Sequence, residues 1–327
     1  MKFLVRVVLV VVLGLTCLVP ITFAWGDDGH EIVARIAARK LVAKTRRRIV
    51  SILRSAVDDE LHLKALVGPA GGPQPTAAAV EDAMVKMATW PDHMPGGKGA
   101  TAPWHFIDVG LFEGPVTSAN RCAAGCITGM IPTLVANLGA NKKLTVTESS
   151  GQTRTFGPDQ ELRFLIHFLG DIHQPLHAST NADAGGNCVK TTGFAHVTPE
   201  LHAVWDTGLV RLVEKPTLKA TVSAFLTEFQ SQIVLEGVTD AAQIATESFT
   251  LAKNDIYPKT KPTAIPIIDH FVDLTPSECN AKAPAEIRAA TVDGPASFDN
   301  DATKKIVREQ VFKAGVRLAT ILNALFQ

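Results

Sequence analysis

The sequence predicts an all-α, single-domain protein built from many helices. Apolar side chains recur at helical spacing along most of the chain, whereas a strand-like alternation is confined to one short stretch. No repeat, linker or low-complexity segment divides the 327 residues, of which 46% are hydrophobic, enough for one large core. This composition excludes a disordered protein, a collagen-like repeat and a disulfide-stapled miniprotein.

The expected helices follow one another along the chain with short interruptions. The first covers 28–43, where apolar residues recur every three or four positions. A run of Gly and Pro at 68–73 separates the second helix from the third. The complete set of expected helices is 28–43, 45–57, 76–89, 126–138, 160–172, 200–213, 218–235, 240–253 and 302–326. A small hairpin is expected over 145–155, and the Pro-rich stretch 258–295 is expected to be mostly loop.

Residues 1–24 are expected to be a secretory signal peptide. Basic residues near the start precede an apolar run over 7–18, and Ala24 supplies a small residue at the predicted cleavage position. An uncleaved membrane anchor is the alternative, but the run is shorter than the roughly 20 residues that a bilayer span needs. The mature domain would then cover 25–327, without a membrane span, and be secreted or periplasmic.

Charge and cysteine content fit an exported globular protein. Lys+Arg and Asp+Glu both number 32, and removal of 1–24 leaves 30 basic against 32 acidic residues. A protein that binds duplex DNA by bulk charge would normally be strongly basic, so the charge disfavours that class. The four remaining cysteines suggest two disulfides, with four free thiols as the alternative. Of three possible pairings we favour Cys122–Cys126 as a local clamp and Cys188–Cys279 as a long staple.

A first group of metal-ligand residues lies in the segment from His167 to His177. His167 and Asp171 are four residues apart, so they share one face of a helix that is otherwise apolar. Burying an imidazole and a carboxylate there requires strong partners. A buried His–Asp hydrogen-bonded pair is the alternative to metal ligation. His177 follows Pro175, which must disturb the helix, so His177 enters from the next turn.

The same spacing recurs at His202 and Asp206 on a second predicted helix. One such pair is weak support for a metal site, but two pairs with His177 between them fit metal ligation much better than chance. Zinc suits imidazole and carboxylate ligands together and requires no redox protection outside the cell.

Asp92 and His105 are two more candidate ligands, each close to a tryptophan in the sequence. Trp25 and His30, at and near the predicted mature N-terminus, are another two. Asp92 ends a Trp-Pro-Asp sequence and His105 follows Trp104, although each alone is more often a turn or core residue. Signal cleavage would free the amino group of Trp25, which is neutral enough near pH 8 to ligate zinc together with its own carbonyl. His30 opens the first helix five residues later.

Taken together, these motifs resemble the single-strand-specific zinc nucleases and 3′-nucleotidases, often called the S-one/P-one nuclease family, which is related in fold to zinc phospholipase C. The resemblance runs in ordered motifs from Trp25 to about Leu209. It implies three zinc ions per chain. The implied ligands are Asp92, His105, His167 and Asp171 for one zinc, Trp25, His30 and the shared Asp171 for a second, and His177, His202 and Asp206 for a third.

The resemblance also implies a mechanism and a substrate class. Two zinc ions about 3.5–4 Å apart share a hydroxide that attacks phosphorus, and the third neutralises the departing 3′-oxygen, which leaves a 5′-phosphate. The implied substrates are single-stranded DNA and RNA and 3′-nucleotides, with no stable protein partner. The implied catalytic residues are Asp92 and Asn187, the latter near the scissile phosphate.

An aromatic slot is implied to select unpaired bases. Phe106 would stack on a base and Asp108 would bind its edge, whereas a paired base cannot reach the slot. A core role for Phe106 is the alternative. One position departs from the family: Pro95 stands where familiar fungal members have a Lys, and Lys98 is a candidate to supply that charge instead.

Two other functions are compatible with the same ligands. Zinc phospholipase C shares the fold, but it typically has Glu at the position of Asp206 and lacks the Trp-His-Phe-x-x-Asp sequence of the base slot. A non-catalytic zinc-binding protein would bind the metal without turnover. The motif set as a whole favours the nuclease. His173, next to the ligands in sequence, is expected to support them from behind.

Overall fold

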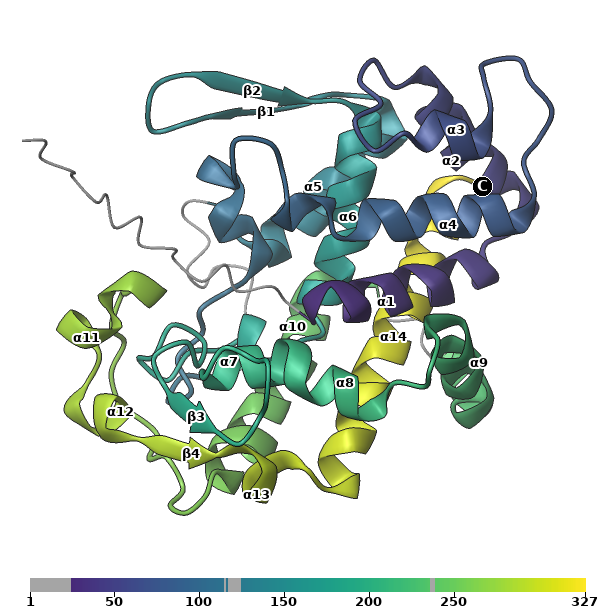
Figure 1. Ribbon diagram of the computed structural model, residues 1–327. Helices are drawn as coiled ribbons and strands as arrows, with labels where there is room; N and C mark the ends of the chain where they lie inside the picture. The colour runs from purple at the N-terminus through teal and green to yellow at the C-terminus, as the bar shows by residue number, and fades with distance from the viewer. Residues whose placement is uncertain (1–24, 115, 117–124, 236–238) are drawn as a thin grey trace, which may run out of the picture.

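A computed structural model describes residues 25–114, 116, 125–235 and 239–327, and within them the fold is all-α, as predicted. Two small two-stranded sheets lie at the edge of the helical body (Figure 1). The α-helices are α1 (Gly26–Lys40), α2 (Ala43–Ser55), α3 (Leu63–Val67), α4 (Ala77–Ala88), α5 (Ile127–Ala140), α6 (Pro158–Asp171), α7 (Leu201–Ala203), α8 (Leu209–Val213), α9 (Leu218–Glu228), α10 (Ala241–Leu251), α11 (Cys279–Lys282), α12 (Ala285–Ala289), α13 (Gly294–Phe298) and α14 (Asp301–Leu325). The strands are β1 (Leu144–Thr147), β2 (Thr153–Phe156), β3 (Lys190–Thr192) and β4 (Thr291–Asp293).

Helix α1 lies in the middle of the helical body and packs on α14, α4, α9 and α6 (Figure 1). Its buried face contains Ile32, Val33 and Ile36, the apolar positions that the spacing predicts to point inward. Gly315 of α14 allows the two helices to approach closely, because a Cβ atom there would lie 2.5 Å from the Cβ of Ile36. The first and last helices of the described chain therefore share one core.

Helix α6 is the most deeply buried helix of the site region. Every residue from Glu161 to Asp171 is buried, and the helix packs on α5, α4 and α14. Its N-terminus has Pro158 in the first turn and a side-chain bond from Gln160 back to the Gly157 N–H. The packing of this helix holds His167 and Asp171 in place without help from a bound ligand.

The predicted hairpin is present as strands β1 and β2, which pair antiparallel in the register Leu144 opposite Phe156. It is attached to α6 through Glu161, whose Oε1 accepts a hydrogen bond from the Leu144 N–H at 2.9 Å. The other carboxylate oxygen, Oε2, has no hydrogen-bond partner among the described residues. Burial raises the pKa of this carboxyl to about 7.

We expect Glu161→Gln to stabilise the protein at pH 8 but not at pH 5. A carboxyl whose folded pKa is raised binds its proton more tightly in the folded state, so stability falls as pH rises from the unfolded pKa of 4.5 to about 7. The full difference amounts to about 3 kcal/mol. Thermal unfolding of both proteins at the two pH values measures the effect, and an equal shift at both pH values would contradict it.

Several short elements were not expected from the sequence. Helix α3 and helices α11 to α13 are five residues or fewer, too short to show helical periodicity. Strands β3 and β4 pair in parallel, Lys190 with Thr291, across about a hundred residues of sequence, which no local pattern can predict. The stretch 258–295 is otherwise mostly loop, as expected.

The predicted helix over 200–213 contains a π-helical segment, Val204–Gly208, between α7 and α8. Such a wide turn inside a helix often marks a functional site.

The disulfide Cys188–Cys279 is present, as favoured from the sequence. Cys122 lies outside the described residues, so its pairing with Cys126 stays a prediction, and residues 1–24 also lie outside them. In the described part of the chain, no helix has both the length and the apolar character of a membrane span.

Candidate metal centre

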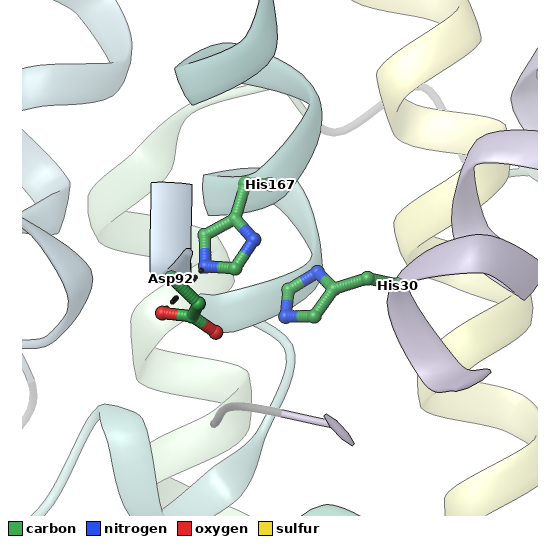
Figure 2. Close-up of side chains that lie close together, drawn as sticks. All are labelled: His30, Asp92 and His167. Carbon is green, nitrogen blue, oxygen red and sulfur yellow. Dashed lines mark ion pairs between the residues drawn. The ribbon is translucent and has the colours of Figure 1, made fainter. Parts of the chain in front are cut away.

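Four segments far apart in the sequence bring one group of predicted ligands together. His30 comes from α1, Asp92 from the 3-10 turn Trp90–Asp92, His105 from the end of the 3-10 segment Gly99–His105, and His167 and Asp171 from α6. Figure 2 shows the His30 ring and the Asp92 carboxylate converging beside His167. All five side chains are at least 95% buried. The convergence of this group agrees with the sequence prediction.

Asp171 is at the centre of this group, which we call the first cluster. Its Oδ2 lies 3.0 Å from His105 Nδ1 and 3.3 Å from His167 Nε2, and its Oδ1 lies 3.3 Å from His30 Nε2. Asp92 Oδ1 lies 3.5 Å from His167 Nε2. Two overlapping sets have donor atoms close enough to hold one cation each, namely His30 with Asp92 and His167, and His105 with His167 and Asp171.

The second cluster consists of His177, His202 and Asp206. Their donor atoms are also close enough to hold a cation: His177 Nε2 lies 3.1 Å from His202 Nε2, which lies 3.2 Å from Asp206 Oδ2. His202 is in α7, Asp206 is in the π-helical segment, and His177 ends the 3-10 turn Pro175–His177. Helix α6 ends at Asp171, and Pro175 begins the separate 3-10 turn. His177 therefore approaches from the following turn, as the sequence predicts.

Backbone carbonyls determine how three of the histidine rings present their nitrogens. The Nδ1–H group of His167 donates to Ala88 O at 2.7 Å. That of His177 donates to His105 O at 2.8 Å, and that of His202 donates to Gly185 O at 2.6 Å. Each bond leaves the Nε2 lone pair directed into a cluster. Metal-ligating histidines are usually oriented in this way by a second hydrogen bond.

Several oxygens and nitrogens of both clusters lack a hydrogen-bond donor or acceptor of their own. Asp92 Oδ2 and His105 Nε2 are buried without a hydrogen-bond partner among the described residues. Asp171 Oδ1 and Asp206 Oδ2 are approached by a histidine Nε2 atom, at 3.3 and 3.2 Å, without a hydrogen bond of good geometry. Buried polar atoms are rarely left in this state. Facing lone pairs on imidazoles and carboxylates fit a divalent cation, and the mixed N and O donor set suits zinc.

The ionisation states of His105 and Asp171 in the first cluster suit metal binding. Burial lowers the pKa of His105 to about 4, and the Lys98 ammonium contributes, so the ring is neutral at physiological pH. Burial alone would raise the pKa of Asp171, but His167, His105 and His30 outweigh it and hold the pKa well below its usual range. Neutral imidazole and ionised carboxylate are the forms that bind metals.

Lys98 lies beside the first cluster. Its Nζ is 2.5 Å from Asp92 Oδ1, and its side chain also lines the adjacent pocket. The loop that carries it is held by the hairpin, because Glu148 accepts from the Ala100 N–H at 2.7 Å and Arg154 donates to Gly97 O at 3.2 Å. Lys98 therefore places a positive charge beside the first cluster, three residues after Pro95, where familiar fungal members of the family have a Lys.

Trp25 is buried at the start of α1 in the left-handed backbone region, with φ of 49°. Its carbonyl accepts a hydrogen bond from the Gly29 N–H at 3.0 Å. Gly29 is required by this turn, because a Cβ atom there would lie 2.6 Å from Trp25 Cβ. Ligation by the freed amino group of Trp25 remains a prediction.

Both clusters border one pocket of about 360 Å³. His105 of the first cluster lines this pocket, as do His177 and His202 of the second cluster. The predicted base-slot residues Phe106 and Asp108 line the same pocket, and Phe106 is 37% exposed. The predicted catalytic Asn187 lines it as well. The structure thus brings the predicted substrate residues to the predicted ligands.

Three lining residues, Leu274, Thr275 and Pro276, were missed from the sequence. They lie in the Pro-rich loop that shows no periodicity and no motif, and only the long disulfide to Cys279 pointed toward this region. Gln174 was also missed: it is fully buried, and its Nε2 donates to Asp206 Oδ1 at 2.6 Å.

The expectation for His173 was wrong. Its Nδ1 donates to Leu169 O at 2.7 Å, and its Nε2 accepts from Arg317 Nη1 at 3.1 Å. Arg317 is itself paired with Glu247 at 2.9 Å. The ring thus joins α6 to α14 and α10 and supports packing rather than a ligand.

Comparison with known proteins agrees with this geometry. The S1/P1 Nuclease family matches residues 25–327, nearly the whole chain. The chain belongs to the S1/P1 nuclease family. It is similar to Endonuclease 2 of Arabidopsis thaliana, with 22% identity over 98% of this chain and 97% of the relative. It is also similar to Nuclease S1 of Aspergillus oryzae (29% identity, 59% of this chain, 56% of the relative) and Nuclease P1 of Penicillium citrinum (34%, 56% and 57%). As an S1/P1 nuclease, the protein is a phosphodiesterase.

Proposed function

We propose that this protein is an exported, zinc-dependent endonuclease that hydrolyses single-stranded DNA and RNA to 5′-phosphate products and also acts as a 3′-nucleotidase. The observation that carries the proposal is the shared pocket, where two ligand clusters meet Phe106 and Asp108. An unpaired, unstacked base can turn out of its strand into such a pocket, whereas a base in a duplex is held by its partner and its stacked neighbours.

We propose three zinc ions per chain, held as the sequence motifs suggest. Asp92, His105, His167 and Asp171 would hold the first, and His177, His202 and Asp206 the third. His30, the Trp25 amino and carbonyl groups and the shared Asp171 would hold the second. Bound zinc supplies a hydroxide nucleophile at neutral pH and neutralises charge on the phosphate. The close approach of His30 Nε2 to Asp171 Oδ1, at 3.3 Å, supports the sharing.

The chain's own side chains would bind and orient the substrate. Phe106 would stack on the base and Asp108 would accept a hydrogen bond from its edge. Asn187 donates one amide hydrogen to Ala184 O at 2.6 Å, which leaves the second for a phosphate oxygen. Lys98, the one Lys or Arg among the described lining residues, would contact the phosphate once a metal neutralises Asp92.

Gln174 provides a test of the third zinc site. Its Oε1 accepts from the Leu176 N–H at 2.6 Å, which forces its Nε2 to donate to Asp206 Oδ1 and leaves Oδ2 for a ligand. We expect Gln174→Met to weaken zinc binding at this site by about 10–100-fold, as removal of such supporting partners does. Competition with a chromophoric chelator measures the affinity. Gln310→Met, at a buried glutamine of α14, is the matched control, and equal weakening in both variants would contradict the assignment.

The proposed function is tested with mature, zinc-loaded protein on four substrates. Single-stranded oligonucleotides should be cleaved to 5′-phosphate ends, duplex DNA far more slowly, a 3′-mononucleotide should release phosphate, and phosphatidylcholine should remain intact. Cleavage of phosphatidylcholine alone would identify a phospholipase C, and stoichiometric zinc without any turnover would identify a zinc-binding protein.

A further inference from the structure

The turn at 274–279 forms part of the substrate pocket although it lies far from every motif in the sequence. Leu274, Thr275 and Pro276 border the same pocket as Phe106 and Asn187. Leu274 is 7% exposed and belongs to the hydrophobic core, whereas Pro276 is exposed. This stretch has an apolar surface and carries no charge, so it is suited to contact a nucleoside and not a phosphate.

Hydrogen bonds within the turn hold its shape. Glu278 Oε2 accepts from the Thr275 N–H at 2.8 Å and from the Thr275 hydroxyl at 3.0 Å. Lys282 lies 2.6 Å from Glu278 Oε1 and so ties the turn to α11. Thr275 and Glu278 form a capping box: the Glu278 side chain accepts from the Thr275 backbone N–H, and the Thr275 side chain accepts from the Glu278 backbone N–H. This box fixes the start of the 3-10 turn Pro276–Glu278. The turn therefore presents Leu274 and Pro276 in a defined arrangement.

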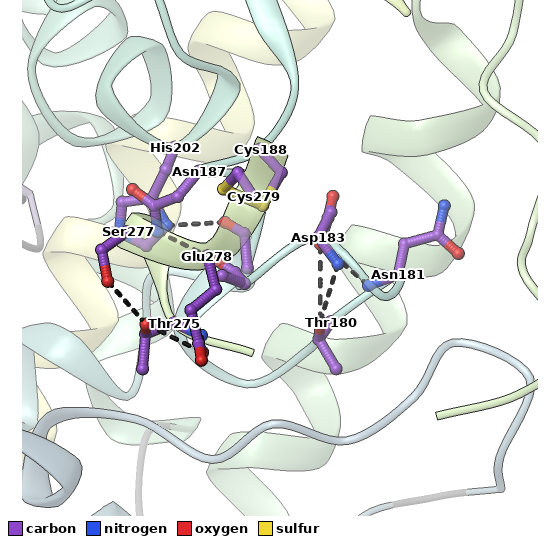
Figure 3. The surroundings of a disulfide bond; sticks show 12 residues. Thr180, Asn181, Asp183, Asn187, Cys188, His202, Thr275, Ser277, Glu278 and Cys279 are labelled. Carbon is purple, nitrogen blue, oxygen red and sulfur yellow. Dashed lines mark hydrogen bonds between the residues drawn. A yellow bond between two sulfur atoms is a disulfide. The ribbon is translucent and has the colours of Figure 1, made fainter. Parts of the chain in front are cut away.

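A covalent bond joins this turn to the loop that bears Asn187. Cys279 ends the turn and is bonded to Cys188, the residue directly after Asn187 (Figure 3). Asn187, His202 and Thr275 line the same pocket. Gly185 of this loop also accepts the bond that orients His202, so the turn is attached to the segment that arranges the second cluster.

A second connection runs from the same loop to the chain leading into the turn. The Asn181 side chain accepts from the Ile268 N–H at 2.9 Å and donates to Pro266 O at 2.9 Å. Asn181 is buried, as is the Asp183–Tyr257 hydrogen bond of 2.7 Å next to it. The approach to the turn and the turn itself are thus both anchored on 181–188.

We propose that residues 274–276 are a substrate-binding wall, held in place by Cys188–Cys279, which contacts the nucleotide through its apolar surface and determines affinity and not the rate of the chemical step. This inference rests on the proposed nuclease function. Contact of the exposed Pro276 with a base or sugar removes apolar surface from water, and the nearly buried Leu274 packs beneath it at the pocket wall. None of the ligand atoms comes from this wall.

The test compares Leu274→Ala/Pro276→Ala with Leu63→Ala, a control at a buried leucine of α3 that does not line the pocket. Steady-state kinetics are measured on a single-stranded oligonucleotide and on methyl 4-nitrophenyl phosphate, a diester without a nucleoside. We expect the wall variant to raise KM for the oligonucleotide about ten-fold, the factor that a loss of about 1.4 kcal/mol represents. Its kcat, its zinc content and its rate on the small diester should match the control.

Two further variants keep the test decisive if the double variant unfolds. Pro276→Ala alone changes an exposed position. Cys188→Ser/Cys279→Ser separates the wall from the loop that bears Asn187 and leaves residues 274–276 unchanged. Both variants should raise KM for the oligonucleotide. Calorimetric titration with a 5′-mononucleotide should show weaker binding in each. An unchanged KM in an active enzyme, or an equal loss of activity on the oligonucleotide and the small diester, would contradict the proposed wall but not the proposed nuclease function. An inactive wild-type enzyme on every nucleic acid would instead overturn the proposed function.

Discussion

Asp171→Asn is expected to remove most of the catalytic activity and to lower the zinc content of the protein. The carboxylate approaches three histidines of the first cluster, with distances between 3.0 and 3.3 Å. An amide would replace one oxygen ligand with a donor that cannot bind a cation. Because a bound metal contributes several kcal/mol to transition-state stabilisation, kcat/KM should fall at least about 10³-fold.

The matched control is Asp159→Asn, the same change on the same helix. Asp159 pairs with Arg163 at 3.1 Å and does not belong to either cluster. Elemental analysis should find fewer zinc ions per chain in Asp171→Asn and an unchanged number in Asp159→Asn. Full zinc content and activity in Asp171→Asn would contradict the assignment of Asp171 as a shared ligand.

Extension of the proposed mature N-terminus, Trp25, is expected to have an effect of similar size. A single residue added before Trp25 would convert its amino group into an amide, which cannot act as a neutral nitrogen ligand for zinc. We expect the extended protein to lose about one zinc per chain and about 100-fold or more in activity, because catalysis depends on two neighbouring metals.

The N-terminal test requires intact-mass confirmation of both protein forms. Trp25 is buried and its carbonyl is already bonded to Gly29, so the added residue must also pass through a closely packed turn. Thermal unfolding of the two metal-free proteins distinguishes a packing defect from a lost ligand. An extended form with full zinc content and full activity would show that the amino group is not a ligand.

The sequence predicts the helices and the ligand clusters for related reasons. His167 and Asp171, like His202 and Asp206, are four residues apart, and a helix converts that spacing into proximity. Long helices such as α1 and α14 show clear periodicity, so their bounds agree with the prediction within a few residues.

Features that depend on distant segments were not predictable. The role of Gln174 depends on Asp206, thirty-two residues later, and that of His173 depends on Arg317. The wall at 274–276 depends on a turn without a motif and on a disulfide across 91 residues. The resemblance of ordered motifs supplied the grouping of the ligands, because spacing alone cannot say which pairs meet.

The packing of α1 on α14 has a consequence for the assembly of the centre. The helix that bears His30 lies early in the sequence, whereas the helix that covers part of its apolar face lies far along the chain (Figure 1). Removal of α14 would expose Ile36 and the neighbouring apolar side chains of α1 to water. The position of His30 is therefore coupled to the folding of a segment that contributes no ligand.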